Sequence, residues 1–217
     1  MLLRSVLLLA SAAGCFGQTA SPAFRKIEDV PGLPRVLLIG DSISIGYTEP
    51  VRTELKDKAN VHRIPMNAAT TVVGLKNLED WLGSGHWDVI HFNFGLHDLK
   101  IMDDGQRQVP LPDYESNLRT IVQRCAKTGA RLIWAATTPV PDAKVSPPRH
   151  SADVAAYNAA ARRIMNDAGV AIDDLYALVN PRLEELQLPA NVHYTAAGYD
   201  VLGRQVAESI LRALDVA

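Results

Sequence analysis

The stretch Arg35-Val-Leu-Leu-Ile-Gly-Asp-Ser42 decides the fold, because four consecutive apolar residues are followed at once by Gly40, Asp41 and Ser42. A short apolar run that stops at a glycine is typical of a strand buried on both faces. Asp and Ser are both favoured at helix starts. The stretch therefore predicts a buried strand, a turn and a helix, with Ser42 at the turn.

The same alternation continues to the end of the chain. Further strands are expected at 61–64, 88–94, 131–136 and 170–172, and helices at 43–58, 72–82, 112–127, 152–168 and 195–214. Strands separated by helices form parallel sheets that are covered on both faces. The sequence predicts an α/β protein, a three-layer α/β/α sandwich around a five-stranded parallel sheet, in one domain over residues 30–217.

Composition excludes several classes of protein. Of 217 residues, 47% are hydrophobic and 21% charged, which is typical of a globular chain and not of a disordered one. The formal net charge of −2 argues against a nucleic-acid partner held by bulk positive charge.

The N-terminus indicates export. Arg4, an apolar run to Ala10 and then small residues are typical of a signal peptide over residues 1–17, with the mature chain beginning at Gln18. The apolar run is too short for a stable membrane span. We therefore expect a secreted or periplasmic protein. A lipoprotein acylated on Cys15 is the alternative.

No metal or other cofactor is predicted. His86, His91 and His97 lie close in sequence, but His91 falls inside a strand, so the three need not converge. The chain has no Cys pair, no H-E-x-x-H helix and no glycine-rich phosphate loop. Cys125, in a helical stretch, is expected to be an inert buried thiol.

Polar segments follow the first and third strands, at the sheet edge where parallel folds bind ligands. Ser42 is a candidate nucleophile because a serine at a helix start is exposed and the free N–H groups of the first turn can stabilise an anion. The alternative is that Asp41 and Ser42 only cap the helix. In the segment Gly95-Leu-His-Asp98, His97 can donate to an oxyanion and Asp98 can fix the loop.

A candidate base lies near the other end of the chain. His193 sits in Asn191-Val-His-Tyr-Thr-Ala-Ala-Gly198, directly before the last helix. A serine nucleophile needs a base within hydrogen-bond reach, and the last helix can return beside the first. The alternative is a loop histidine without a special role.

Taken together, these segments resemble the SGNH/GDSL hydrolase family from Arg35 to Leu214. The first block is Ile39-Gly-Asp-Ser-Ile43, the third is Gly95-Leu-His-Asp98, and the last is Val192-His-Tyr-Thr-Ala-Ala-Gly198. The resemblance implies a flavodoxin-like fold and an esterase with Ser42 as nucleophile and His193 as general base. It also implies an oxyanion hole made by the backbone N–H of Ser42, a second-block N–H and the third block. Ala69 is the expected second-block donor and Gly74 the poorer alternative.

The chain departs from the family pattern twice. His97 stands where the family has an Asn donor, and Ala190 stands where it has the Asp that supports the catalytic His. Asn191 is close but carries no negative charge. The site is therefore expected to work as a Ser–His dyad, or another acid reaches the ring.

The expected function is hydrolysis of small acyl esters, acetyl foremost, of a small molecule or glycan through an acyl-serine intermediate. The alternatives are a non-catalytic glycan-binding or scaffold protein and an O-acyltransferase. Loops 99–111 and 138–149 are expected to set specificity. They carry Arg107, Lys144, Arg149 and His150, which either meet an acidic sugar or are ordinary solvated charges. No oligomeric state is predicted.

Overall fold

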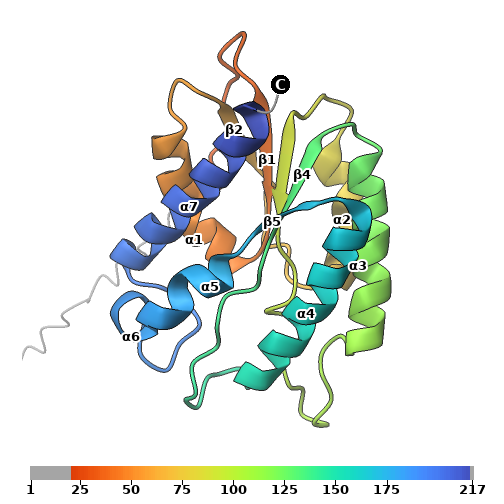
Figure 1. The fold of residues 1–217 in the computed structure, drawn as a ribbon, viewed down its shortest axis with the longest axis vertical. Coiled ribbons are helices and arrows are strands. Elements are labelled where there is room, and N and C mark those ends of the chain that lie inside the picture. The colour runs from red at the N-terminus through yellow and green to blue at the C-terminus, as the bar shows by residue number, and fades with distance from the viewer. Residues whose placement is uncertain (1–20, 216–217) are drawn as a thin grey trace, which may run out of the picture.

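A computed structural model describes residues 21–215, and its centre is one parallel sheet (Figure 1). The strands are β1 (Arg35–Ile39), β2 (Asn60–Arg63), β3 (Val89–Phe92), β4 (Arg131–Ala135) and β5 (Ala171–Asp173). Their order is β2-β1-β3-β4-β5 and every neighbouring pair is parallel. This is the flavodoxin-like order, so the predicted five-stranded parallel sheet is confirmed.

The central strands are apolar because both faces of the sheet are covered. Val36 to Ile39 of β1 are all buried, and Val36 lies opposite Val61 of β2 and Val89 of β3. All four residues of β3 are buried as well. Side chains of successive strand residues point to opposite faces, so two covered faces require a continuous apolar run.

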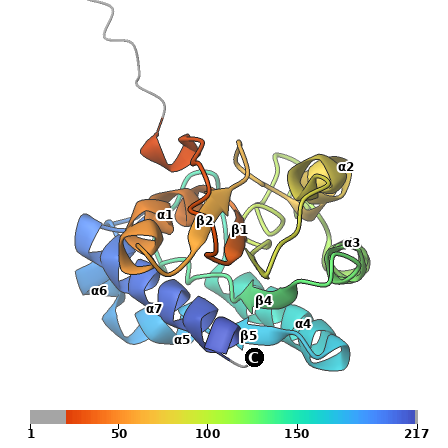
Figure 2. The same ribbon diagram turned by 90° about the horizontal axis from the view of Figure 1, so that it is seen from above.

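Helices form the two outer layers (Figure 2). One layer contains α1 (Ser42–Glu54) and α7 (Ala196–Asp215), and the other contains α2 (Thr71–Leu82), α3 (Leu111–Ala126) and α4 (Ser151–Ala168). The sheet lies between them, which confirms the predicted sandwich. Cys125 of α3 is buried and free, and burial raises the pKa of its thiol to about 12, as expected for an inert thiol.

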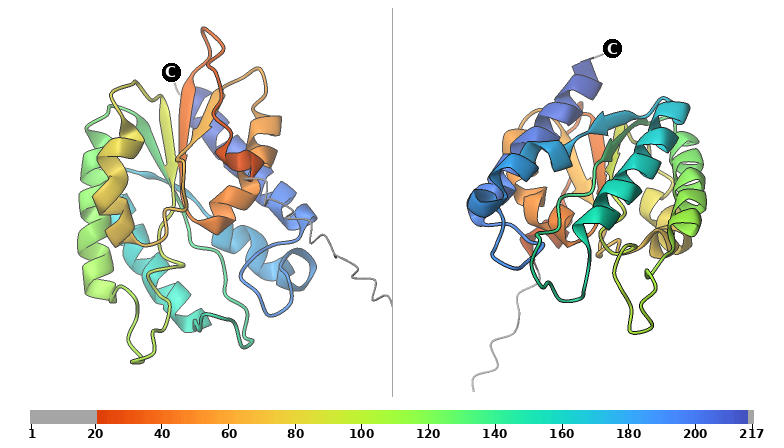
Figure 3. Two further views of the ribbon diagram at one scale, coloured as in Figure 1. Left: turned by 180° about the vertical axis from the view of Figure 1, so that it is seen from behind. Right: turned by 60° about the horizontal axis from the view of Figure 1, so that its bottom comes forward.

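The first and last helices pack closely against each other (Figure 3). A Cβ atom added at Gly203 of α7 would lie 2.3 Å from Cβ of Pro50 in α1, and one added at Gly46 would lie 2.0 Å from the Tyr199 ring. Glycine is required at both positions because any side chain would separate the helices. This packing brings the start of α7 beside the start of α1.

Two predicted boundaries are wrong. The helix expected over 43–58 ends at Glu54, and Asp57 just beyond it has a left-handed φ of 61° that no α-helix continues through. The strand expected over 88–94 is only β3, because the chain then leaves the sheet at Asn93.

One stretch has helices that the sequence analysis did not assign. Between β5 and His193 lie α5 (Leu175–Val179), a 3-10 helix η2 (Asn180–Arg182) and α6 (Leu183–Leu186), while η1 (Pro22–Phe24) precedes the sheet. These turns are too short to show a helical period. The N-cap of α5 at Asp174, whose carboxylate accepts from the N–H of Ala177, was the available signal.

The expected leader, residues 1–17 with Cys15, lies outside the described residues. Within residues 21–215, no helix combines the length and apolar character needed to cross a bilayer.

Candidate functional site

Ser42 and His193 meet at the carboxyl edge of the sheet. Ser42 is the first residue of α1, directly after β1, and Nε2 of His193 lies 2.9 Å from its Oγ. The two residues are 151 positions apart in the chain. The α1–α7 packing carries His193 across, because the loop that holds it leads into α7.

The turn before Ser42 is fixed by its own polar residues. Asp41 is the N-cap of α1, and its Oδ1 accepts from the N–H of Ile43 at 2.9 Å. Capping by Asp41 confirms one half of the predicted cap pair and leaves the Ser42 hydroxyl free to face His193. As the first helical residue, Ser42 also has an N–H without a partner inside the helix. That N–H is the donor an oxyanion needs.

The second ring nitrogen of His193 is held by an amide. Nδ1 lies 2.8 Å from Oδ1 of Asn191, which also accepts from the backbone N–H of His193 at 3.0 Å. Because an amide oxygen only accepts, Nδ1 carries the proton and Nε2 is left as the acceptor that faces Ser42. This is the tautomer that a general base requires.

No acid stands behind the ring. Ala190 is exposed and has a left-handed φ of 50°. Within the described part of the chain, no carboxylate forms an ion pair with His193. Of the two arrangements expected from the sequence, another acid reaching the ring is therefore not seen, and Asn191 takes the orienting position.

His97 is held by Lys100. Nζ of Lys100 lies 2.9 Å from Nδ1 of His97, and an ammonium group can only donate, so Nδ1 accepts and Nε2 carries the proton. Burial lowers the pKa of His97 to about 4; the charge of Asp41 opposes this, and those of Lys100, Arg149 and His193 reinforce it. His97 is thus neutral at pH 7, and its Nε2–H has no partner within residues 21–215.

Asp98 fixes the same turn, as its position suggested. Its Oδ1 accepts from the N–H of Thr71 at 2.8 Å and from the hydroxyl of Thr71 at 2.6 Å, which ties the turn to the start of α2. Asp98 is fully buried and its Oδ2 has no partner in residues 21–215. Burial therefore raises the pKa of Asp98 to about 7, although the bonds from Thr71 oppose the shift.

Gly95 allows this turn to approach β4. Its φ is 145°, and a Cβ atom there would lie 2.4 Å from Oγ1 of Thr137. The Thr137 hydroxyl donates to the carbonyl of Phe94 at 3.2 Å, so the turns after β3 and β4 are bonded together. A side chain at position 95 would push them apart.

In the structure, the backbone N–H groups of both second-block candidates, Ala69 and Gly74, are already hydrogen-bonded. Ala69 has a left-handed φ of 51°, and its N–H donates to Oδ1 of Asn67 at 2.8 Å, so the expected donor is engaged. Gly74, the poorer alternative, is wrong. It lies inside α2 with its N–H bonded to the carbonyl of Thr70, and it serves to let Phe94 pack close to the helix.

Arg63 is a site residue that the sequence analysis missed. It ends β2, and its guanidinium donates to Oγ of Ser44 at 2.6 Å and to the carbonyl of Gly40 at 2.8 Å. The turn that carries Ser42 is thus clamped from the neighbouring strand. Burial lowers the pKa of Arg63 to about 10. An arginine at the end of a short strand beside the Gly40-Asp-Ser42 turn was the available signal.

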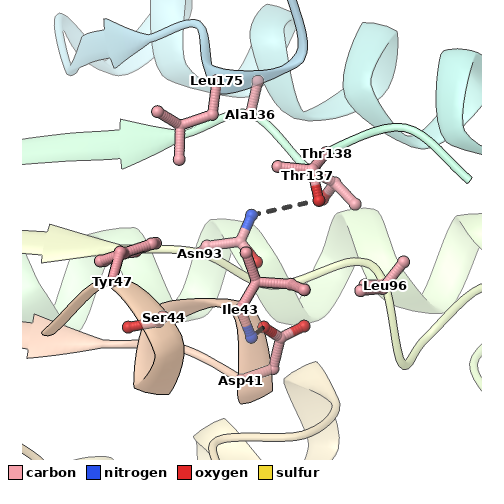
Figure 4. Close-up of a pocket in the computed structure, with 10 residues that line it drawn as sticks. All are labelled: Asp41, Ile43, Ser44, Tyr47, Asn93, Leu96, Ala136, Thr137, Thr138 and Leu175. Carbon is pink, nitrogen blue, oxygen red and sulfur yellow. Dashed lines mark hydrogen bonds between the residues drawn. The ribbon is translucent and has the colours of Figure 1, made fainter. Parts of the chain in front are cut away.

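The small cavity lined by Asp41, Ile43 and Asn93 is structural (Figure 4). Asn93 reaches across it and donates to the carbonyl of Ala135 at 2.7 Å and to Oγ1 of Thr137 at 3.3 Å. The cavity has a volume of about 10 Å³, which is room for about one water molecule. The cavity is therefore too small for an ester substrate, and the loops after β3 and β4 project beyond this edge of the sheet (Figure 3).

The three histidines weighed as metal ligands lie in different places. His91 is buried and pairs with Asp173 at 3.0 Å, His86 is exposed beside Asp88, and His97 binds Lys100. Within the described ranges, no group of three or more His, Cys, Asp or Glu side chains gathers in a way that could hold a metal ion.

Comparison with known proteins gives one family match. Residues 38–201 match the model of the GDSL-like lipase/acylhydrolase family. A search of the curated proteins found no match.

Similar solved structures share the fold. A lipase/acylhydrolase from Enterococcus faecalis is 22% identical, with a TM-score of 0.70 over 82% of this chain and 95% of that one. The acetyl xylan esterase AlAXEase is 16% identical, with a TM-score of 0.69 over 81% and 99%. The acetylxylan esterase Axe2 from Geobacillus stearothermophilus is 19% identical, with a TM-score of 0.68 over 82% and 94%.

Proposed function

Because the chain belongs to the GDSL-like lipase/acylhydrolase family and is therefore a carboxylic ester hydrolase, we propose that it is a secreted serine esterase that removes small acyl groups from carbohydrate or similar polar substrates. The observation that carries the proposal is the 2.9 Å contact between Oγ of Ser42 and Nε2 of His193, with Nδ1 held by Asn191. Nucleophile, base and orienting group form one connected chain.

The first half of the reaction acylates Ser42. Its Oγ attacks the ester carbonyl carbon while Nε2 of His193 takes the hydroxyl proton. The tetrahedral oxyanion accepts from the N–H of Ser42 and from Nε2–H of His97. Ala69 adds a third donor once the Asn67 oxygen gives way to the oxyanion. Collapse of the intermediate breaks the bond to the alcohol, which leaves with the proton from His193.

The second half returns the enzyme to its starting state. A water molecule gives a proton to His193 and attacks the acyl carbon, and the same donors stabilise the second oxyanion. Collapse releases the carboxylic acid and gives the proton back to Oγ of Ser42. No cofactor is needed at any step, because every proton moves between Ser42, His193, the alcohol and water.

An acetyl group is the favoured acyl group. Two of the similar structures are named as acetyl xylan esterases, which supports a small acyl group on a sugar. Transfer of the acyl group to a sugar hydroxyl would use the same acyl-serine, and product analysis with a sugar acceptor distinguishes the two. Family membership and the intact Ser42–His193 contact argue against the non-catalytic alternative.

The direct test is Ser42→Ala, assayed on p-nitrophenyl acetate. Loss of a serine nucleophile lowers kcat by several orders of magnitude, roughly 10⁴-fold or more. Thr53→Ala is the control, because it removes an exposed hydroxyl at the other end of α1, bonded to the carbonyl of Glu49, and does not touch the Ser42 turn. Labelling of the wild type by a fluorophosphonate, absent in Ser42→Ala, identifies the same atom. Unchanged turnover in Ser42→Ala would end the proposal.

Export completes the proposal. A leader over residues 1–17 with cleavage before Gln18 is supported by the charge, apolar run and small residues of the sequence. A secreted or periplasmic enzyme would meet glycan esters outside the cytoplasm.

A further inference from the structure

Two cations lie side by side at the rim of the site. The N–H of Ile101 donates to the carbonyl of Pro148 at 2.9 Å, which joins the loops after β3 and β4. Lys100 and Arg149 flank that bond, one on each loop. Both also hold the turn that carries His97, because Lys100 donates to the His97 ring and Arg149 donates through Nε to the carbonyl of Leu96 at 2.8 Å.

Neither cation has a carboxylate partner. In residues 21–215, no Asp or Glu forms an ion pair with Lys100 or Arg149. The contrast is Arg107 on the same loop, whose guanidinium is bonded to both oxygens of Asp153 at 2.7 and 3.1 Å. Of the basic residues that the sequence placed near a substrate, Arg107 is thus neutralised by its neighbour.

The two charges are also partly withdrawn from water. Arg149 is only 8% exposed. Burial lowers the pKa of Arg149, and it lowers that of Lys100 as well, with a further decrease from the charge of Arg149. The charge of Asp41 acts in the opposite direction on both groups, and that of Asp98 does so on Lys100, but at longer range than an ion pair. Buried charges without partners are costly, so they are usually completed by a ligand or an ion.

Free donors remain for such a ligand. Arg149 uses Nε for Leu96 and Nη1 for the carbonyl of Pro147, and Nη2 has no partner in the described part of the chain. Lys100 uses one of its three ammonium protons for His97. Arg149 also lines an open hollow of about 550 Å³ in front of α4, shared with Asp142 and Lys144, which gives a ligand access to Arg149 itself; Lys100 does not line this hollow.

We propose that Lys100 and Arg149 bind a carboxylate on the alcohol part of the substrate, so that this esterase prefers acylated acidic sugars over neutral ones. The inference rests on the proposed function and adds a substrate class to it. We assign the carboxylate to the alcohol part because Lys100 binds Nδ1 of His97, on the side of the ring opposite the Nε2–H proposed for the oxyanion, and an acetyl group is too short to reach around the ring.

The experiment compares two substrates that differ only in charge: an O-acetylated methyl glucuronoside and its uncharged carboxyl methyl ester. We expect the wild type to have a kcat/KM at least about tenfold higher for the charged substrate, the size of one charge-assisted hydrogen bond. In Arg149→Gln the ratio falls towards one, and in Arg149→Lys it is partly retained. The ratio of the two kcat/KM values does not change when part of the enzyme is unfolded, because both rates fall by the same factor.

Arg107→Gln is the matched control. It removes the same charge from the neighbouring loop, where Asp153 already neutralises it, and it should keep the wild-type ratio. A wild-type ratio near one, or equal losses in Arg149→Gln and Arg107→Gln, would overturn the inference. Free sulfate and free glucuronate can also be compared as inhibitors of the wild type. If sulfate inhibits as strongly as glucuronate, the two cations do not select a sugar carboxylate, and the inference is overturned. Absence of any p-nitrophenyl acetate hydrolysis by the wild type would instead contradict the proposed function.

Discussion

Asn191 occupies the place that a carboxylate usually holds behind a catalytic histidine. Its Oδ1 orients the His193 ring through Nδ1 at 2.8 Å, but it cannot offer a negative charge to the imidazolium that forms when Ser42 attacks. Orientation and charge are therefore separated at this site: the amide orients the ring, and among residues 21–215 no carboxylate forms an ion pair with it.

Asn191→Asp should add the missing charge without changing the shape of the side chain. We expect kcat for p-nitrophenyl acetate to rise, and the acidic limb of the pH profile to move to higher pH, because a carboxylate favours the protonated ring. Asn191→Ala is the matched comparison and should lower kcat by about tenfold or more through loss of the orienting bond. A pH profile of Asn191→Asp identical to that of the wild type would show that position 191 does not act on the ring.

His97 and Lys100 are a second pair in which one residue orients the ring of the other, as Asn191 does for His193. Lys100 is the positioning residue of this pair. Lys100→Met should lower kcat for p-nitrophenyl acetate by about tenfold, because the His97 proton is then free to move to Nδ1 and a donor is lost from the oxyanion hole. His97→Asn retains an N–H donor and should keep most of the activity.

The double variant gives the discriminating result. In the His97→Asn background, Lys100→Met should have little effect, since an amide has no tautomer to set. The ring ¹⁵N shifts of His97 provide an independent readout, with protonated Nε2 in the wild type and a mixture in Lys100→Met. Equal losses from Lys100→Met in both backgrounds would mean that Lys100 is only structural.

Among the elements, the turn after β3 is the one on which the site depends most. Asp98 binds Thr71 at the start of α2, Gly95 lies against Thr137 after β4, and Lys100 and Arg149 bind the residues between them. The sequence predicted a turn at the end of this strand because Gly95 and Asp98 follow it. Thr71, Thr137 and Arg149 were not expected as its partners, because they are 27 to 53 residues away in the chain.

Asp98 makes the stability of this element depend on pH. Its pKa of about 7 lies above its ordinary value of 3.8, so the folded protein holds a proton that the unfolded chain releases. That stabilisation is complete below about pH 4 and is lost as pH rises to 7. Relative to Asp98→Asn, which has no such proton, the wild type should lose about 2 kcal/mol of unfolding free energy between pH 5 and 7.

Urea unfolding of both proteins at a series of pH values measures this difference directly. His97, with a pKa of about 4, contributes with the opposite sign between pH 4 and 6.5 in both proteins, so it cancels in the comparison. Parallel stability curves for the wild type and Asp98→Asn would contradict a protonated Asp98.

At the scale of the whole molecule, the leader is a separate prediction from the fold. Expression of the full chain in a secreting bacterial host should give a mature protein whose first residue is Gln18, measured by intact mass and N-terminal sequencing. Substitution of Arg4 and the apolar run by polar residues should leave the protein in the cytoplasm. A mature protein that starts at an acylated Cys15 would support the lipoprotein alternative, and an uncleaved Met1 would contradict export.

The sequence by itself determined the sheet, its five long helices and the choice of Ser42 and His193 as the candidate reacting side chains. Short apolar runs predict the strands, and amphipathic spacing predicts the long helices. The residues Gly40-Asp-Ser42 predict a turn from their own conformational preferences. Each of these signals depends only on residues that are close together in the sequence, so they can be recognised in a single sequence without a structure.

Only the tertiary structure decided how the site is supported. Asn191 behind His193, Lys100 behind His97, Arg63 beneath the Ser42 turn and the unpaired Arg149 are contacts whose meaning depends on which charges and hydrogen-bond partners other elements bring near. Hydrogen bonds and charge effects act over a few ångströms of space, irrespective of distance along the chain, and that proximity exists only after α1 and α7 have packed together.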